Sequence, residues 1–137
     1  MLEHILEGDS FCLRISLNIF ESDIKYPENT TMTAFVSCNG FSAKAEMDID
    51  IKEFAEFSKN LMGIYNTLEG EATIKEPYGY EKYISFTADK TGHIIVKGYL
   101  CDGFRNNELR FESVLDQTYL KAFADELMLT YSKYDRQ

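Results

Sequence analysis

The chain has 137 residues, of which 45% are hydrophobic; this suits a single globular domain over residues 1–137 and excludes a disordered chain. Its formal net charge of −9 disfavours binding to nucleic acid and favours association with a basic protein, although the same charge also serves solubility. The acidic N-terminus and the lack of a long apolar run exclude a signal peptide and a membrane-bound protein, so we expect a cytoplasmic location.

The first part of the chain shows the pattern of strands and a hairpin. Residues 11–20 alternate between apolar and polar side chains, which predicts a half-buried strand, and the polar stretch 21–30 is expected to be a loop. Asn39-Gly40 lies between two alternating runs and predicts a type I′ hairpin over residues 31–48. The register of this turn places four apolar pairs on one face: Met32–Met47, Ala34–Ala45, Val36–Ala43 and Cys38–Phe41.

Residues 50–68 form the strongest helix signal, and we expect the other elements to pack around this helix. Asp50 is a good N-cap, Glu53 completes a capping-box-like pair, and Gly70 follows the end of the helix. The apolar stripe includes Phe54, Phe57, Leu61, Ile64 and Leu68. Gly63 falls opposite this stripe, where a glycine costs about 1 kcal/mol relative to alanine and has no packing reason.

The second part of the chain contains signals for four strands and a further helix. The strands are expected over residues 71–75, 83–88, 93–101 and 109–115, and the helix over residues 117–134, with Asp116 as its cap. The turn Asp89–Gly92 fits a type I turn with a G1 bulge. Its register places three pairs on the inner face: Ala88–Ile94, Phe86–Val96 and Ile84–Gly98.

Hairpin-connected strands pair antiparallel, and two amphipathic helices need an apolar sheet face to cover. The predicted class is therefore α+β, with one antiparallel sheet of about six to seven strands and both helices packed on one face. The predicted order of elements is βββ-α-ββββ-α.

The sequence lacks the usual catalytic motifs: there is no GxSxG, no HExxH and no Walker or dinucleotide-binding glycine pattern. We expect His4 in a mobile terminus and His93 as a solvated turn residue rather than a general base. Asp48, Asp50 and Glu53 gather at a helix N-terminus, where capping accounts for them. An acid–base pair or a divalent-cation site is the alternative there.

Three cysteines, Cys12, Cys38 and Cys101, are widely spaced and form no CxxC pair, which fits a reducing compartment and no disulfide framework. Cys38 faces the core in the predicted register, and Cys12 and Cys101 are expected to face outward. A zinc site built from the three cysteines and His93 would require four strands to converge without the usual local ligand pairs.

The outer face of the predicted sheet carries more aromatic side chains than a solvated face requires. A contiguous patch of this kind marks a protein interface. The predicted partner-binding residues are Phe35, Tyr83, Ile95 and Tyr99 on that face, Tyr78 and Tyr80 in the loop 76–82, and the unexplained Gly63.

Several short motifs resemble a known family. The helix reads F-x-x-F-x-x-x-L; it is followed by Leu68, Gly70, Glu71 and Ala72, then by Asp89, Thr91, Gly92 and His93, and finally by Asp116, Gln117, Thr118 and Leu120. This pattern resembles the small bacterial WapI-type immunity proteins. The resemblance implies a non-enzymatic protein that binds and neutralises the toxin of a neighbouring gene, with no cofactor and no catalytic residues.

Two alternatives stay open. The first is a small-ligand-binding or enzymatic domain with a pocket between the sheet and the helices, using the carboxylates at Asp48–Glu53. The second is a homodimer that forms through the outer face of the sheet.

Overall fold

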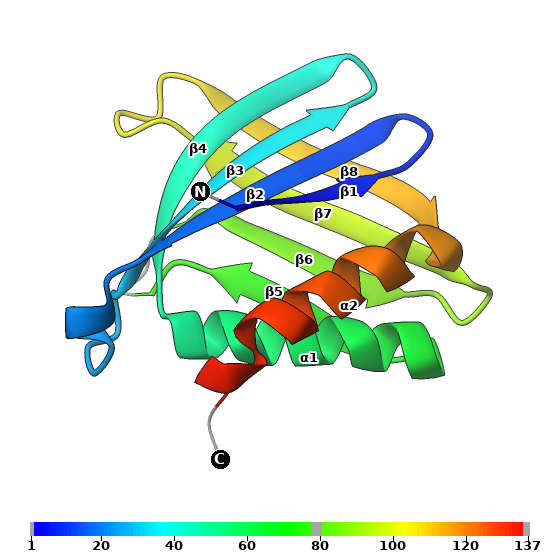
Figure 1. Ribbon diagram of the computed structural model, residues 1–137. Helices are drawn as coiled ribbons and strands as arrows, with labels where there is room; N and C mark the ends of the chain where they lie inside the picture. The colour runs from blue at the N-terminus through cyan, green and yellow to red at the C-terminus, as the bar shows by residue number, and fades with distance from the viewer. Residues whose placement is uncertain (1, 78–80, 136–137) are drawn as a thin grey trace.

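The computed structural model describes residues 2–77 and 81–135, which form eight strands and two α-helices (Figure 1). The strands are β1 Glu3–Glu7, β2 Phe11–Ile19, β3 Thr30–Cys38, β4 Phe41–Ile49, β5 Glu71–Lys75, β6 Tyr83–Ala88, β7 His93–Cys101 and β8 Glu108–Asp116. The helices are α1 Ile51–Thr67 and α2 Leu120–Tyr131, with 3-10 turns η1 Glu21–Asp23, η2 Gln117–Tyr119 and η3 Ser132–Tyr134. None of the helices in the described residues has the length and hydropathy needed to cross a membrane.

The α+β class is confirmed, but the single sheet is wrong. The strands form two antiparallel four-stranded sheets with the orders β1-β2-β3-β4 and β5-β6-β7-β8. The 17-residue helix α1 separates them, so the chain leaves the edge of the first sheet and begins a second sheet instead of extending the first. In Figure 1 the strands of the second sheet cross behind those of the first.

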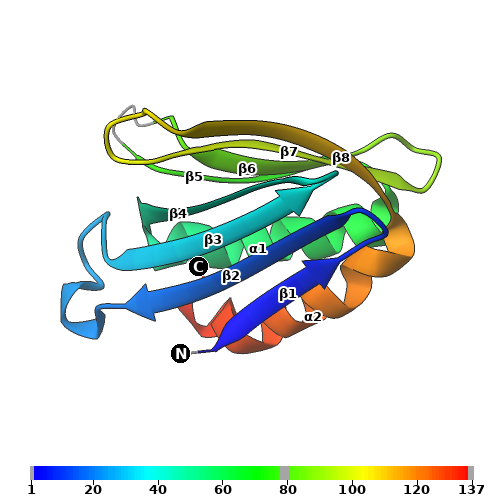
Figure 2. The ribbon, with the colours of Figure 1, turned by 90° about the horizontal axis from the view of Figure 1, so that it is seen from above.

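The two sheets and the two helices enclose one core. Both helices lie on the same side of the pair of sheets (Figures 1 and 2). α1 packs against α2 and β5, α2 also packs against β1, and β4 lies against β7 and β8 of the other sheet. The helices therefore bridge the open side between β1 and β5, and do not cover one face of one sheet.

Both predicted hairpin registers are confirmed. Asn39 and Gly40 have φ of 52° and 87°, as a type I′ turn requires, and the four predicted pairs from Met32–Met47 to Cys38–Phe41 occur. Phe41 nevertheless remains 69% exposed, because it lies at the tip of the hairpin. In the second hairpin Gly92 has φ of 93°, and the pairs from Ala88–Ile94 to Ile84–Gly98 occur.

The predicted helix caps are confirmed in most respects. The Asp50 carboxylate accepts a hydrogen bond from the Lys52 backbone N–H at 2.9 Å, as expected of an N-cap. Leu68 ends α1 in the left-handed region, with φ of 56°. The predicted helix over residues 117–134 is divided into η2, α2 and η3, and Asp116 caps η2 by accepting from the Thr118 N–H at 2.9 Å.

Strand β1 and the position of His4 correct the sequence prediction. His4 is fully buried, and its Nδ1 and Nε2 lie 2.5 Å from Glu126 Oε1 and 2.6 Å from the Tyr131 hydroxyl. Only His4 and Leu6 of β1 face inward. With a histidine at one of two core positions, the strand lacks the apolar alternation that would identify it.

Candidate functional site

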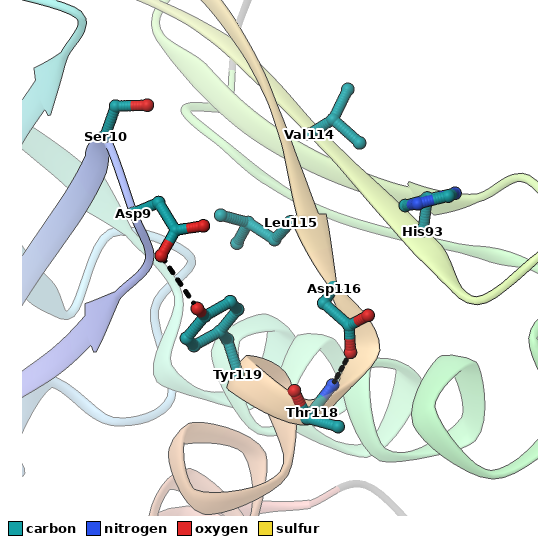
Figure 3. Close-up of a pocket in the computed structure, with 8 residues that line it drawn as sticks. All are labelled: Asp9, Ser10, His93, Val114, Leu115, Asp116, Thr118 and Tyr119. Atoms are coloured by element: carbon teal, nitrogen blue, oxygen red, sulfur yellow. Dashed lines mark hydrogen bonds between the residues drawn. The ribbon is translucent and has the colours of Figure 1, made fainter.

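A pocket of about 740 Å³ opens where the β1–β2 turn meets the end of β8 and the start of η2. We refer to it as the corner pocket. Figure 3 shows the side chains that line it: Asp9, Ser10, His93, Val114, Leu115, Asp116, Thr118 and Tyr119. Both sheets and the C-terminal helical segment thus contribute to one site.

Two contacts hold the β1–β2 turn against this corner. A Cβ at Gly8 would lie 2.6 Å from Leu115 Cδ2, so any larger residue would require the Leu115 side chain to shift. The Tyr119 hydroxyl donates a hydrogen bond of 2.9 Å to Asp9 Oδ1 (Figure 3). The corner pocket is therefore a product of the tertiary fold and not of a local motif.

The corner pocket carries negative charge at neutral pH. The backbone N–H of Thr118, its hydroxyl and the nearby His93 together hold the pKa of Asp116 below its usual 3.8. The hydrogen bond to Asp9 raises the pKa of Tyr119, so this phenol remains a protonated donor. Asp116, with Asp9 beside it in the lining, makes this a site that suits a cationic partner group.

The pocket does not hold a nucleophile and base in contact. His93 Nδ1 lies 2.9 Å from the Thr91 hydroxyl and 3.4 Å from Asp89 Oδ2, both in its own turn. In Figure 3, Ser10 and His93 lie on opposite sides of Leu115. The position expected for His93, exposed beside the turn, is confirmed.

An apolar row adjoins the corner pocket on the outer face of the second sheet. Ile95 pairs with Val114 across β7 and β8, and the next outward-facing pair is His93 with Asp116. Val114 is 58% exposed and Ile95 is half-buried. Ile95 therefore lies on the predicted outer face, next to an apolar neighbour that the prediction left out.

Tyr83 and Tyr99 share the same face of the second sheet as directly paired residues, but they do not form an exposed patch. Tyr83 is half-buried, and Tyr99 is only 1% exposed. The Arg110 guanidinium lies 4.4 Å from the centre of the Tyr99 ring, and the Tyr99 hydroxyl donates to Glu108 at 2.8 Å. Burial, together with that hydrogen bond, raises the pKa of Tyr99. The prediction of an exposed Tyr99 is wrong, because side chains of β8 cover it.

Two further predicted partner-binding residues, Phe35 and Gly63, do not join this face. Phe35 lies in the first sheet, half-buried beneath the Arg14 guanidinium at 5.1 Å. Gly63 lies on α1, where an added Cβ would meet no atom within 4 Å. Tyr78 and Tyr80 fall outside the described residues.

The described residues give little support to a zinc site built from the cysteines or to a cation or acid–base site at Asp48–Glu53. Cys101 lies on the same side of β7 as Tyr99 but is buried, and Cys38 is buried as expected. The carboxylate of Asp50 caps α1 and also accepts from the buried Asn29 amide at 3.0 Å. Residues 2–77 and 81–135 contain no cluster of His, Cys, Asp and Glu that could hold a metal ion.

The predicted partner-binding residues include none of those that line the corner pocket, and Val114, Asp9 and Tyr119 are among the members that they missed. Val114 carried a signal, since it is an apolar residue at an outward-facing position of a strand. Asp9 and Tyr119 carried none, because they are separated by 110 residues and meet only in the folded chain.

Comparisons with known proteins identify a family for the chain. The model of the "Immunity protein WapI-like family" matches residues 1–135. The comparison with curated proteins finds no match. A solved structure titled "Structure of the plant transcriptional regulator PBF-2" is similar, with a TM-score of 0.48 and 3% identity, and the similarity covers 95% of this chain and 80% of that chain.

Proposed function

The chain belongs to the Immunity protein WapI-like family, and from this premise we propose that it binds and neutralises a protein toxin. The observation that carries the proposal is the family match over residues 1–135. In this proposal the chain acts in the cytoplasm and neutralises the toxin by binding alone, without a catalytic residue or a cofactor.

The proposed contact surface is the corner surface, which we define as Ile95, Val114, Tyr119, Asp9 and Asp116. Exposed Val114 beside half-buried Ile95 provides an apolar centre, and the two carboxylates provide a polar rim. This combination is typical of protein interfaces. The net charge of −9 supports a basic partner, whose approach such a surface would accelerate.

The test is co-expression with the protein encoded by the adjacent gene, followed by size-exclusion chromatography with light scattering. We expect a stoichiometric complex, and the same measurement on the chain alone shows whether it forms a homodimer. If no product of a neighbouring gene binds, the proposed function is wrong.

The contact surface is tested with a matched pair of substitutions. Val114→Asp places a charge at the centre of the corner surface and should weaken binding roughly tenfold or more. Leu129→Asp makes the same kind of change at an 86% exposed residue of α2 and should leave binding unchanged. If the two variants bind equally well, the toxin contacts another surface.

A further inference from the structure

β4 is an edge strand, and part of its open side lacks hydrogen-bond partners. On that side the Asp48 N–H donates to Glu76 Oε2 at 3.1 Å, and the Glu46 carbonyl accepts from Lys82 Nζ at 2.7 Å. Backbone groups alternate between the two sides of an antiparallel strand, so Ser42 and Lys44 also direct their N–H and C=O groups to the open side. Within the described residues these groups have no hydrogen-bond partner.

The open side of β4 faces a groove and not bulk solvent alone. A pocket of about 600 Å³ lies beside Ser42 and Lys44, and one of about 500 Å³ lies beside Glu46 and Asp48. The two pockets share Lys44, Cys101 and Asp102 as lining residues, so they form one continuous edge groove. Its far wall is the end of the β7–β8 hairpin.

Side chains close only one half of this edge. Glu76 and Lys82, which flank the β5–β6 loop, bind the backbone groups of Glu46 and Asp48 as a neighbouring strand would. Edge strands are commonly protected in this way against unwanted pairing. No comparable side chain among the described residues covers the half that contains Ser42 and Lys44.

The half of the edge groove beside Glu46 and Asp48 is acidic, and one carboxylate oxygen in it lacks a hydrogen-bond donor among the described residues. Its lining carboxylates are Glu46, Asp48, Glu76 and Asp102. The Glu76 side chain is only 5% exposed, and its Oε1 has no hydrogen-bond partner within residues 2–77 and 81–135. Lys82 Nζ lies 3.7 Å from Oε1 and donates instead to the Glu46 carbonyl. A buried carboxylate oxygen without a donor is costly, and a cationic donor would satisfy it.

We propose that the edge groove binds an extended, basic segment of the protein partner by strand addition to β4. The segment pairs its backbone with Ser42 and Lys44, and an arginine or lysine side chain further along it displaces Lys82 from Glu76. Backbone pairing supplies affinity in this mode of recognition, and the side-chain pocket supplies specificity. The inference rests on the proposed function for the identity of the partner, but the groove itself can be tested without the toxin.

The first test titrates the 15N-labelled chain with a capped hexapeptide of alternating lysine and valine. We expect the amide signals of Ser42 and Lys44 to shift and their hydrogen exchange to slow. The control peptide has the same side chains but N-methyl groups on alternate backbone nitrogens, which remove the hydrogen-bond donors. Equal binding of both peptides, or shifts confined to other residues, would overturn the proposal, and this comparison needs no variant of the protein.

The second test uses two substitutions at one position. Lys44→Pro removes an N–H on the open side without removing a hydrogen bond between β3 and β4. Lys44→Ala keeps that N–H and removes only the side chain. We expect the proline variant to bind the hexapeptide roughly tenfold more weakly or worse, and the alanine variant to bind like the wild type. Equal affinity of the two variants would contradict strand addition.

The same pair of variants separates this inference from the proposed function. If the toxin binds the wild type and the alanine variant but not the proline variant, strand addition is supported. If it binds all three equally, the edge groove is not its contact and the proposed function stands. If the wild type binds no toxin, the proposed function fails and the hexapeptide titration alone decides the edge groove.

Discussion

The imidazole of His4 and the phenol of Tyr131 lie 2.6 Å apart, across 127 residues of sequence. The second imidazole nitrogen lies 2.5 Å from Glu126 Oε1, and the Tyr131 ring meets Phe54 of α1 edge-on at 5.2 Å. His4 therefore links β1 to α2, and the Tyr131 ring links α2 to α1. The first strand and the last helix close the core together.

Removal of the Tyr131 hydroxyl should show how much its contact with His4 contributes to the free energy of unfolding. Tyr131→Phe keeps the ring but leaves a fully buried nitrogen of His4 without a partner. An unsatisfied buried polar group costs about 1–3 kcal/mol, so we expect the free energy of unfolding in urea to fall by that amount. Tyr134→Phe is the matched control, because it removes a solvent-exposed hydrogen bond to Glu21. A loss no larger than that of the control would show that His4 is not held by Tyr131.

Gly63→Ala should stabilise the chain. The site lies inside α1, an added Cβ would meet nothing within 4 Å, and alanine in a helix interior is favoured over glycine by about 1 kcal/mol. Thermal unfolding measures the gain. Gly98→Ala is the opposite case, since its Cβ would lie 2.5 Å from the Tyr83 carbonyl oxygen and should destabilise the sheet by about 1–3 kcal/mol. A stabilised Gly63→Ala chain that no longer binds the toxin would place Gly63 in the interface.

The sequence predicted the hairpins because their turns are determined locally. Asn39-Gly40 selects a type I′ turn and Gly92 a positive φ, and each turn then fixes the register of its two strands. The helix caps at Asp50 and Asp116 are local in the same way. These predictions needed no information about the rest of the chain.

The errors concern relationships between distant segments. No local pattern shows that α1 separates two sheets, because strand order depends on which edges meet in space. Tyr99 occupies an outward-facing position in the alternating pattern of β7, but Arg110 of the next strand covers it. The corner pocket depends on a contact between Asp9 and Tyr119. Of the corner surface, the outward-facing positions of Ile95 and Val114 were within reach of the sequence.

Stability at low pH should depend on Asp50. Burial opposes its ionisation, but hydrogen bonds from the Lys52 N–H and the Asn29 amide outweigh burial and hold its pKa below 3.8. The stability that the carboxylate contributes is therefore present above pH 3.8 and lost as the pH falls through the lower folded-state pKa. Asp50→Asn keeps a good N-cap and should lose this dependence. Urea unfolding from pH 2 to 6 should show a difference between the two chains that shrinks with falling pH; a constant difference would contradict the assignment.

Glu76 should show the opposite dependence. Burial raises its pKa above 4.5, although the Asp48 N–H and Lys82 favour the ionised form. A carboxyl whose folded-state pKa is raised contributes most below its unfolded-state pKa, and this contribution is lost as the pH rises through the folded-state value. In the Glu76→Gln variant the glutamine oxygen can still accept from the Asp48 N–H, but the side chain no longer ionises. The free energy of unfolding should therefore not fall as the pH rises, and at pH 7 it should match or exceed that of the wild type.

The matched control for Glu76 is Glu46→Gln, an exposed carboxylate that lines the same groove. It should change the free energy of unfolding by less than about 0.5 kcal/mol. If Glu76→Gln proves much less stable than the wild type at pH 7, the carboxylate is needed for the fold. If it is equally or more stable but binds the basic hexapeptide more weakly, the chain keeps a buried charge that its fold does not require. That combination would assign Glu76 to recognition of a cation in the edge groove.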